Sequence, residues 1–110
     1  MADQNVLIEK KDRIAWVWLN KPDRLNVLSP DMLDSIEEAF RSLENDEEVQ
    51  VVIVSGKGKA FAAGADIKVM SGFDPEQAAY FARRGQAVMN YIETFRKPVI
   101  AAINGYALSL

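Results

Sequence analysis

The stretch that decides the fold runs from an apolar segment into a loop of small residues: Val49-Gln50-Val51-Val52-Ile53-Val54-Ser55-Gly56-Lys57-Gly58-Lys59-Ala60-Phe61-Ala62-Ala63-Gly64-Ala65-Asp66-Ile67-Lys68. Its first six residues form a short β-branched run, which is typical of a buried strand. Ligand loops in α/β folds follow the carboxyl ends of such strands. The sequence therefore predicts an α/β fold, with a loop from Ser55 to about Gly72 as the candidate binding segment.

A hairpin and a helix are expected before this strand. Residues 6–10 and 13–19 predict two strands joined by a tight turn at Lys11-Asp12. Both faces of the second strand are apolar, so we expect both to be covered. Ser29-Pro30-Asp31 is a helix start, because serine caps, proline fits the first turn and aspartate favours the positive helix end. Apolar residues at spacings of three and four continue to about Asn45, so strand, helix and strand form a βαβ unit.

A second helix and a further strand are expected after the loop. Asp74-Pro75-Glu76-Gln77 has the pattern of a capping box. An apolar stripe follows over about 20 residues, comprising Ala78, Phe81, Ala82, Gly85, Met89, Ile92 and Phe95. Lys97-Pro98 ends the helix, residues 99–103 form a buried strand, and Asn104-Gly105 marks a turn. A parallel sheet that ends with this strand has an unprotected edge.

The composition limits the possible functions. The 110 residues are 49% hydrophobic with a net charge of -3, which fits one globular domain or part of one and argues against nucleic-acid binding. There is no histidine or cysteine, so acid–base work falls to other residues, and a thiol nucleophile is excluded. No segment has the roughly 20 apolar residues of a membrane span. We expect a cytoplasmic protein, with acidic residues 31–50 forming a solvated helix and turn.

The loop does not match the common phosphate-binding patterns. A Walker A loop needs serine or threonine after Gly58-Lys59, and Ala60 stands there. A dinucleotide fingerprint that starts at Gly56 needs a glycine where Phe61 stands. The small residues instead leave backbone N–H groups open to a ligand, and a helical turn near Ala65 would aim its first N–H groups at an anion. On composition alone, a flexible loop with solvated lysines remains the alternative.

Three blocks of sequence carry a family resemblance, and they span nearly the whole chain. The blocks are Asn20-Lys21-Pro22 through Arg24-Leu25-Asn26-Val27-Leu28-Ser29, then Lys59-Ala60-Phe61-Ala62-Ala63-Gly64-Ala65-Asp66-Ile67-Lys68-Val69-Met70, then Lys97-Pro98-Val99-Ile100-Ala101-Ala102-Ile103-Asn104-Gly105-Tyr106-Ala107-Leu108. In this order and spacing they resemble the crotonase superfamily, most closely its enoyl-CoA hydratases. The resemblance implies a crotonase-like ββα spiral fold, of which residues 1–110 would be the N-terminal part.

The resemblance also implies a reaction and a site. Family members bind acyl-CoA thioesters and stabilise an enolate-like oxyanion with two backbone N–H groups, the first of which would be that of Ala65. Enoyl-CoA hydratases add water to 2-enoyl-CoA, with coenzyme A present only as part of the substrate and no metal. The implied CoA-binding residues are Arg24, Leu25, Asn26, Ala63, Gly64, Ala65, Asp66, Ile67 and Lys68. Lysines 57, 59 and 68 against Asp66 would suit the CoA phosphates, although a solvated loop fits Lys57 and Lys59 equally well.

The chain departs from the family after Leu108. A run of glycines normally follows and gives the second donor, whereas Ser109-Leu110 stand here, with Leu110 at the donor position. The two hydratase glutamates lie beyond it in the family, and we expect Glu76 and Glu93 to be solvated. The expected chain is therefore an N-terminal part without the acid–base pair. The alternatives are an enoyl-CoA isomerase, acyl-CoA hydrolase or decarboxylase, or an inactive fragment that self-associates through its open edge. The family resemblance implies a homo-oligomer.

Overall fold

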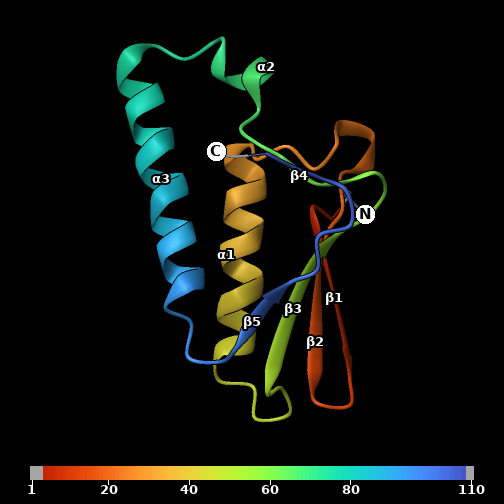
Figure 1. Cartoon of the computed structure of the whole chain (residues 1–110). Coiled ribbons are helices and arrows are strands. Elements are labelled where there is room, and N and C mark those ends of the chain that lie inside the picture. The colour runs from red at the N-terminus through yellow and green to blue at the C-terminus, as the bar shows by residue number, and fades with distance from the viewer. Residues whose placement is uncertain (1–3, 109–110) are drawn as a thin grey trace.

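The expected N-terminal hairpin forms one side of a four-stranded sheet in the computed structural model, which describes residues 4–108 (Figure 1). The sheet has the order β1-β2-β3-β5, with β1 antiparallel to β2 and the other neighbours parallel. The strands are β1 (Val6–Lys11), β2 (Ile14–Leu19), β3 (Val51–Gly56) and β5 (Val99–Ala101). The hairpin turn lies one residue later than predicted, at Asp12 and Arg13, whose φ angles are 52° and 70°. Positive φ at both positions matches the twist of the flanking strands.

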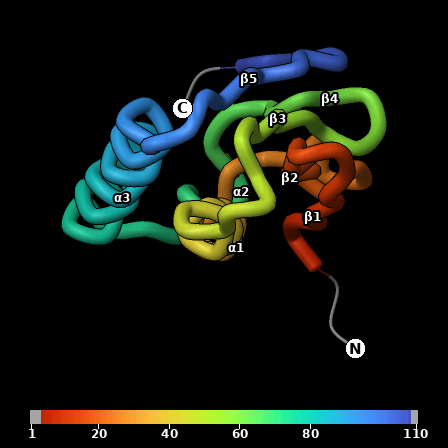
Figure 2. The backbone as a smooth tube through the Cα atoms, turned by 90° about the horizontal axis from the view of Figure 1, so that it is seen from below, coloured from red at the N-terminus to blue at the C-terminus, as the bar shows by residue number. Residues whose placement is uncertain are grey.

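The two long helices lie on the same side of this sheet (Figures 1 and 2). Helix α1 (Pro30–Glu44) begins at the predicted cap, where the Ser29 hydroxyl accepts a hydrogen bond from the Met32 N–H. Helix α3 (Pro75–Glu93) begins with the predicted capping box of Asp74 and Gln77. Among the helices within residues 4–108, none combines the length and apolar content of a membrane-spanning segment.

The core lies between α1 and one face of the sheet. Ala15, Val17 and Leu19 of β2 are almost fully buried there. Helix α1 covers them with its own buried stripe of Met32, Leu33, Ile36, Ala39, Phe40 and Leu43. The Phe40 ring meets Phe95 edge-on, with centroids 5.2 Å apart. The helical spacing read from the sequence therefore identifies the core face of α1.

The opposite face of β2 is only half-buried, which corrects the expectation that both faces are covered. Trp16 and Trp18 stack on this face, with ring centroids 5.2 Å apart and ring planes within 9° of parallel. Lys57 places its ammonium 4.1 Å from the centre of the Trp18 ring. Large apolar side chains on both faces of a strand therefore do not require two covering layers, because the rings shield one another.

A second, two-stranded sheet was missed by the sequence analysis. It pairs β4 (Ala60–Ala63) in parallel with β6 (Tyr106–Leu108), and both segments had been treated as loop or turn. The strands have three or four residues, too short for a clear alternation. Two short helical segments complete the fold: η1 (Pro22–Arg24), a 3₁₀ turn, and α2 (Ile67–Met70). β5 is the edge strand of the first sheet, at the edge that we expected to be unprotected. After β5 the chain leaves this sheet and forms β6 of the second sheet.

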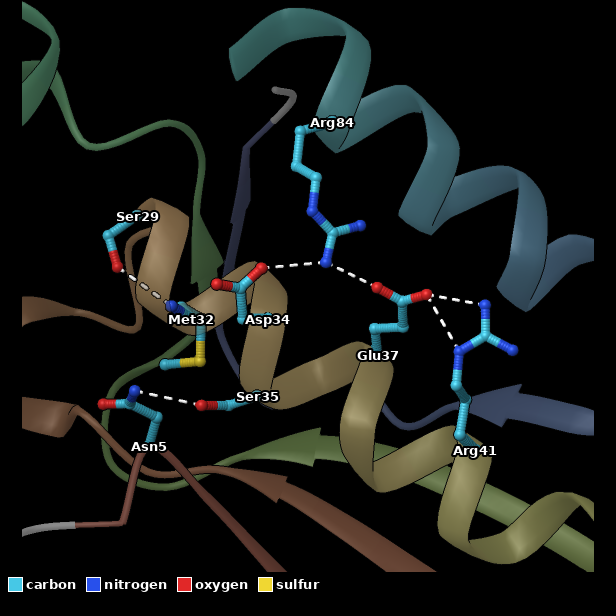
Figure 3. A network of polar contacts seen from close by, with 8 residues as sticks. All are labelled: Asn5, Ser29, Met32, Asp34, Ser35, Glu37, Arg41 and Arg84. Carbon is cyan, nitrogen blue, oxygen red and sulfur yellow. Dashed lines mark hydrogen bonds and ion pairs between the residues drawn. The ribbon is translucent and has the colours of Figure 1, made fainter. Parts of the chain in front are cut away.

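Part of the acidic stretch differs from expectation, because Asp34 and Glu37 are paired rather than only solvated. Arg84 of α3 donates to both Asp34 and Glu37 of α1, and Glu37 also accepts from Arg41 (Figure 3). These hydrogen bonds, first from Arg41 and then from Arg84, lower the pKa of Glu37. Asp34 and Glu37 of α1 and Arg84 of α3 thus form a polar seam between the two helices, which we call the helix seam.

Candidate functional site

The candidate site lies on the segment that runs from the end of β3 through β4 to α2. Residues 57–59 form the turn between β3 and β4, here called the β3–β4 turn. After β4 the chain bends at Gly64, whose φ of +83° favours glycine. Asp66 then caps α2 by accepting from the Val69 N–H at 3.3 Å. A helical turn does follow Ala65, as expected, but its first residue is Ile67.

Three backbone hydrogen bonds fix this segment against the β2–α1 loop, residues 20–29. The Ala63 N–H donates to the Leu25 carbonyl at 3.1 Å. The Leu28 N–H donates to the Gly64 carbonyl at 2.7 Å, and the Asp66 N–H donates to the Leu28 carbonyl at 3.1 Å. Leu28 and Ala65 thereby form a parallel bridge between two segments that are far apart in sequence.

The bridge determines where the Ala65 N–H points. In a parallel ladder, a residue whose two neighbours bond to the partner strand turns its own N–H and C=O to the other side. Gly64 and Asp66 supply both bonds to Leu28, so the Ala65 N–H points away from that loop. Within residues 4–108 it donates to no acceptor. A rigidly held backbone donor with no internal partner can receive the oxygen of a ligand.

A partly buried ion pair lies beside this donor. Arg24 donates from Nη2 to Asp66 Oδ2 at 2.8 Å, and the Asp66 side chain is 4% exposed. Asp66 therefore bonds to both Arg24 and the α2 backbone. Its carboxylate offers little surface to a ligand, whereas the Arg24 side chain remains 46% exposed. The pair holds Asp66 at the start of α2 and leaves the Arg24 side chain about half exposed.

The structure brings most of the predicted site residues together, in three different environments. Asn26 is fully buried, and its amide is taken up by internal hydrogen bonds. Arg24 and Leu25 are exposed next to it, in and just after η1. Ile67 is 79% exposed and Lys68 is also exposed on α2, while Ala63 and Ala65 are half-buried and Gly64 is buried. Lys57 places its ammonium over the Trp18 ring, so this lysine of the loop is in contact with the protein itself.

Other predicted positions lie outside this cluster. Glu76 and Glu93 are both exposed on α3, as expected. Leu110, the position of the second donor in the family, lies outside the described residues. Within residues 4–108, no group of three acidic side chains is arranged to hold a metal ion.

An apolar groove opens between α3 and the two sheets. Its volume is about 680 Å³, and it is lined by Leu19, Leu28, Ile36, Val54, Phe61, Ala62, Gln86, Met89, Ile92, Val99, Ala101, Ala107 and Leu108. Leu28, whose backbone bridges to Ala65, is one of these lining residues. The groove is therefore continuous with the element that positions the donor.

Asn104 has a role in the structure that its sequence context does not predict. Its Oδ1 accepts from the Gly56 N–H at 3.1 Å, and its Nδ2 donates to the Gly58 carbonyl at 3.0 Å. The only sequence signal was the Asn104-Gly105 pair, which indicates a turn but not which carbonyls the amide would reach.

The arrangement defines a class: an α/β protein that presents a backbone N–H from a loop at the carboxyl end of a parallel strand. The sequence profile of the enoyl-CoA hydratase/isomerase family matches residues 9–109. The chain belongs to this family, and its fold is the N-terminal part of the crotonase fold.

Individual relatives agree with this assignment. The chain is 40% identical over 109 residues to a crotonyl-CoA hydratase of Syntrophomonas wolfei, and 42% identical over 109 residues to a short-chain-enoyl-CoA hydratase of Clostridium acetobutylicum. Each match covers 98% of this chain and 42% of the relative, so the chain spans about two-fifths of the length of these proteins. A crystal structure of an enoyl-CoA hydratase from Bacillus anthracis superposes with a TM-score of 0.89 at 33% identity, over 93% of this chain and 40% of that one.

Proposed function

We propose that this chain supplies the first half of a site that adds water to 2-enoyl-CoA thioesters, completed by residues outside the 110. One observation carries the proposal: the Ala65 N–H is held by the Leu28 bridge and turned away from it without an internal acceptor. As water adds to the double bond, negative charge develops on the thioester oxygen. A fixed donor there stabilises the transition state by about 3 kcal/mol.

The remaining roles follow from the chemistry of hydration. Two carboxylates outside the chain activate the water and handle the α-proton. Arg24, Leu25 and Lys68 lie exposed around the donor and are proposed to contact the CoA moiety. Coenzyme A enters only as part of the substrate. An isomerase, hydrolase or decarboxylase would use the same donor with other acid–base groups. As part of the same proposal, the activity belongs to fatty acid metabolism in the cytoplasm.

Calorimetry on the 110-residue chain tests the half-site. We expect butyryl-CoA, which has the thioester oxygen but no double bond, to bind more tightly than free CoA. Ala65→Pro removes the N–H without breaking an internal hydrogen bond. The preference for butyryl-CoA over CoA should therefore disappear in this variant, while circular dichroism confirms folding. Equal affinity for both compounds in the unaltered chain would refute the donor assignment.

A turnover assay separates the half-site from a complete enzyme. The enoyl thioester absorbance should stay constant when the chain is mixed with crotonyl-CoA, because no acid–base pair is assigned within it. A longer chain that continues with a glycine run and two glutamates should consume the substrate. Hydration by the 110 residues alone would contradict the assignment of the carboxylates to positions outside them.

The second candidate is an inactive chain that self-associates as a homo-oligomer. The observation that favours it is exposed apolar surface at the C-terminal end of the described chain, where Ile100, Ile103 and Leu108 are 53%, 62% and 61% exposed. Exposed apolar surface of this kind promotes association. Light scattering over a range of concentrations tests it, because a monomer throughout would eliminate this candidate.

A further inference from the structure

The side chain of Asn26 makes three hydrogen bonds inside the protein. This side chain is fully buried. Oδ1 accepts from the Lys21 N–H at 2.7 Å, while Nδ2 donates to the Lys57 carbonyl at 3.1 Å and the Ala60 carbonyl at 2.9 Å. Its φ of +52° is a conformation that asparagine tolerates better than most residues do. One amide thus ties the β2–α1 loop to both ends of the β3–β4 turn.

Asn104, from the segment between β5 and β6, bonds to the same turn. Its Nδ2 donates to the Gly58 carbonyl and, at 3.4 Å, to the Ala60 carbonyl. The Ala60 oxygen therefore accepts from both asparagines, which lie 78 positions apart in the chain. One comes from the loop that bridges to Ala65, and the other directly precedes Gly105 and β6. The two segments meet at one oxygen.

The close approach depends on a glycine at the end of β3. A Cβ added at Gly56 would lie 2.4 Å from the Ala60 oxygen and 2.8 Å from Asn26 Nδ2. No side chain fits there without displacing the bonded groups. The backbone between β3 and β4 is therefore packed directly against the asparagine amide.

We propose that Asn26, assisted by Asn104, is the positioning residue of the Ala65 donor, an inference that rests on the proposed function. The Asn26 amide fixes residues 25–28 relative to β4. Those residues hold Ala63, Gly64 and Asp66 through three backbone bonds, and the two at Gly64 and Asp66 orient the Ala65 N–H. Asn26 therefore acts on a thioester oxygen through the backbone, not by touching CoA.

Amide hydrogen exchange tests the coupling without any ligand. Asn26→Asp keeps the size and the tolerance for positive φ but removes both N–H donors. Exchange at the Leu28 and Asp66 amides, which form the bridge, should become at least tenfold faster, because the hydrogen bonds to the Lys57 and Ala60 carbonyls are both lost. The Val52 amide in β3, which donates to the Pro98 carbonyl, should change far less. The matched control is Asn90→Asp, the same substitution at an exposed position of α3.

The outcomes of this experiment are distinct. Equal acceleration at Leu28, Asp66 and Val52 would show only a global loss of stability and would overturn the proposal. Unchanged exchange at the bridge would overturn it as well. If Asn26→Asp does not fold, Asn104→Asp makes the same test, with a smaller expected effect because Asn104 is more exposed.

Ligand affinity separates this inference from the proposed function. In Asn26→Asp, the preference for butyryl-CoA over free CoA should fall about tenfold, with little change for CoA itself, because only the thioester oxygen uses the donor. Loss of affinity for both compounds to the same extent would overturn the positioning role. If the unaltered chain shows no such preference, the proposed function fails, and the exchange experiment still decides whether Asn26 controls the bridge.

Discussion

Two regions of the molecule are held together in opposite ways. Around the β3–β4 turn, buried amides donate to backbone carbonyls, and the backbones approach so closely that only glycine fits at Gly56 and Gly105. In the helix seam, exposed and half-exposed charges bridge α1 and α3 above an apolar layer in which Phe40 meets Phe95. The hydrogen bonds of the first region fix backbone positions. The contacts of the second region join side chains on the surfaces of two helices.

The difference explains which region can carry a backbone donor. Amide–carbonyl bonds in a buried site have few alternative partners, so they fix a geometry. Exposed ion pairs contribute little energy and tolerate rearrangement. The Ala65 N–H, which we propose as the donor to a thioester oxygen, needs a fixed position, and its bridge to Leu28 adjoins the first region. Substitutions should therefore affect the two regions very differently.

The largest effect is expected for an added methyl group beside the β3–β4 turn. In Gly105→Ala, the new Cβ would lie 1.9 Å from the Lys59 carbonyl oxygen, which cannot move without breaking the packing of β4. We expect a loss of about 4 kcal/mol in the free energy of unfolding, the upper range for single substitutions. Urea denaturation measures it. Gly72→Ala is the control, because its Cβ would meet only the Val69 oxygen at 3.7 Å, and a similar loss there would contradict the argument.

A smaller but still large effect is expected in the apolar layer of the helix seam. Phe40→Ala empties a fully buried site and removes the edge-on contact with Phe95. We expect a loss of about 3 kcal/mol by thermal or urea denaturation. Tyr80→Ala, an aromatic position on α3 that is 63% exposed, should cost about 0.5 kcal/mol or less. Equal costs would mean that the layer does not stabilise the seam.

The ion pairs between α1 and α3 should contribute less to stability than this apolar layer does. Arg84→Gln removes the ion pairs to Asp34 and Glu37 but keeps much of the side chain. A loss of about 1 kcal/mol is expected at low salt, shrinking as salt is added. The paired measurement is urea denaturation at two salt concentrations. If the loss in the free energy of unfolding does not depend on salt, Arg84 stabilises the protein through packing and not through its charge.

Most of the fold could be predicted from local patterns. The cap at Ser29, the capping box at Asp74 and the helical spacing of apolar residues determined both long helices. These signals act within a few residues, so sequence displays them directly. The second sheet could not be predicted, because β4 and β6 each depend on a partner that is more than 40 residues away.

The candidate site could be located in sequence, but the roles of its residues could not be separated. The resemblance placed Asn26, Ala65 and Asp66 in one binding set. Burial divides them: Asn26 and Asp66 face inward and support the backbone, while Ala65 carries the open N–H. A side chain's direction depends on tertiary packing, and no spacing rule within the loop specifies it.

The final prediction concerns the hydroxyl at the edge of the helix seam and should have the smallest effect near neutral pH. Burial, followed by a hydrogen bond to Glu44, raises the pKa of Tyr91 to about 12 from 10.0. Both folded and unfolded chains hold the phenol proton below pH 10. Between about pH 10 and 12 only the folded chain keeps it, so the free energy of unfolding should fall as the pH rises through that window.

Tyr91→Phe isolates this contribution, because it keeps a ring beside Phe95 and Arg41 but removes the hydroxyl. Its free energy of unfolding should fall less steeply over the same pH window, as measured by urea denaturation at a series of alkaline pH values. Parallel curves for the two proteins would show that Tyr91 has the same proton affinity in both states. The helix seam would then be held by its apolar layer and ion pairs alone, without a contribution from the buried phenol.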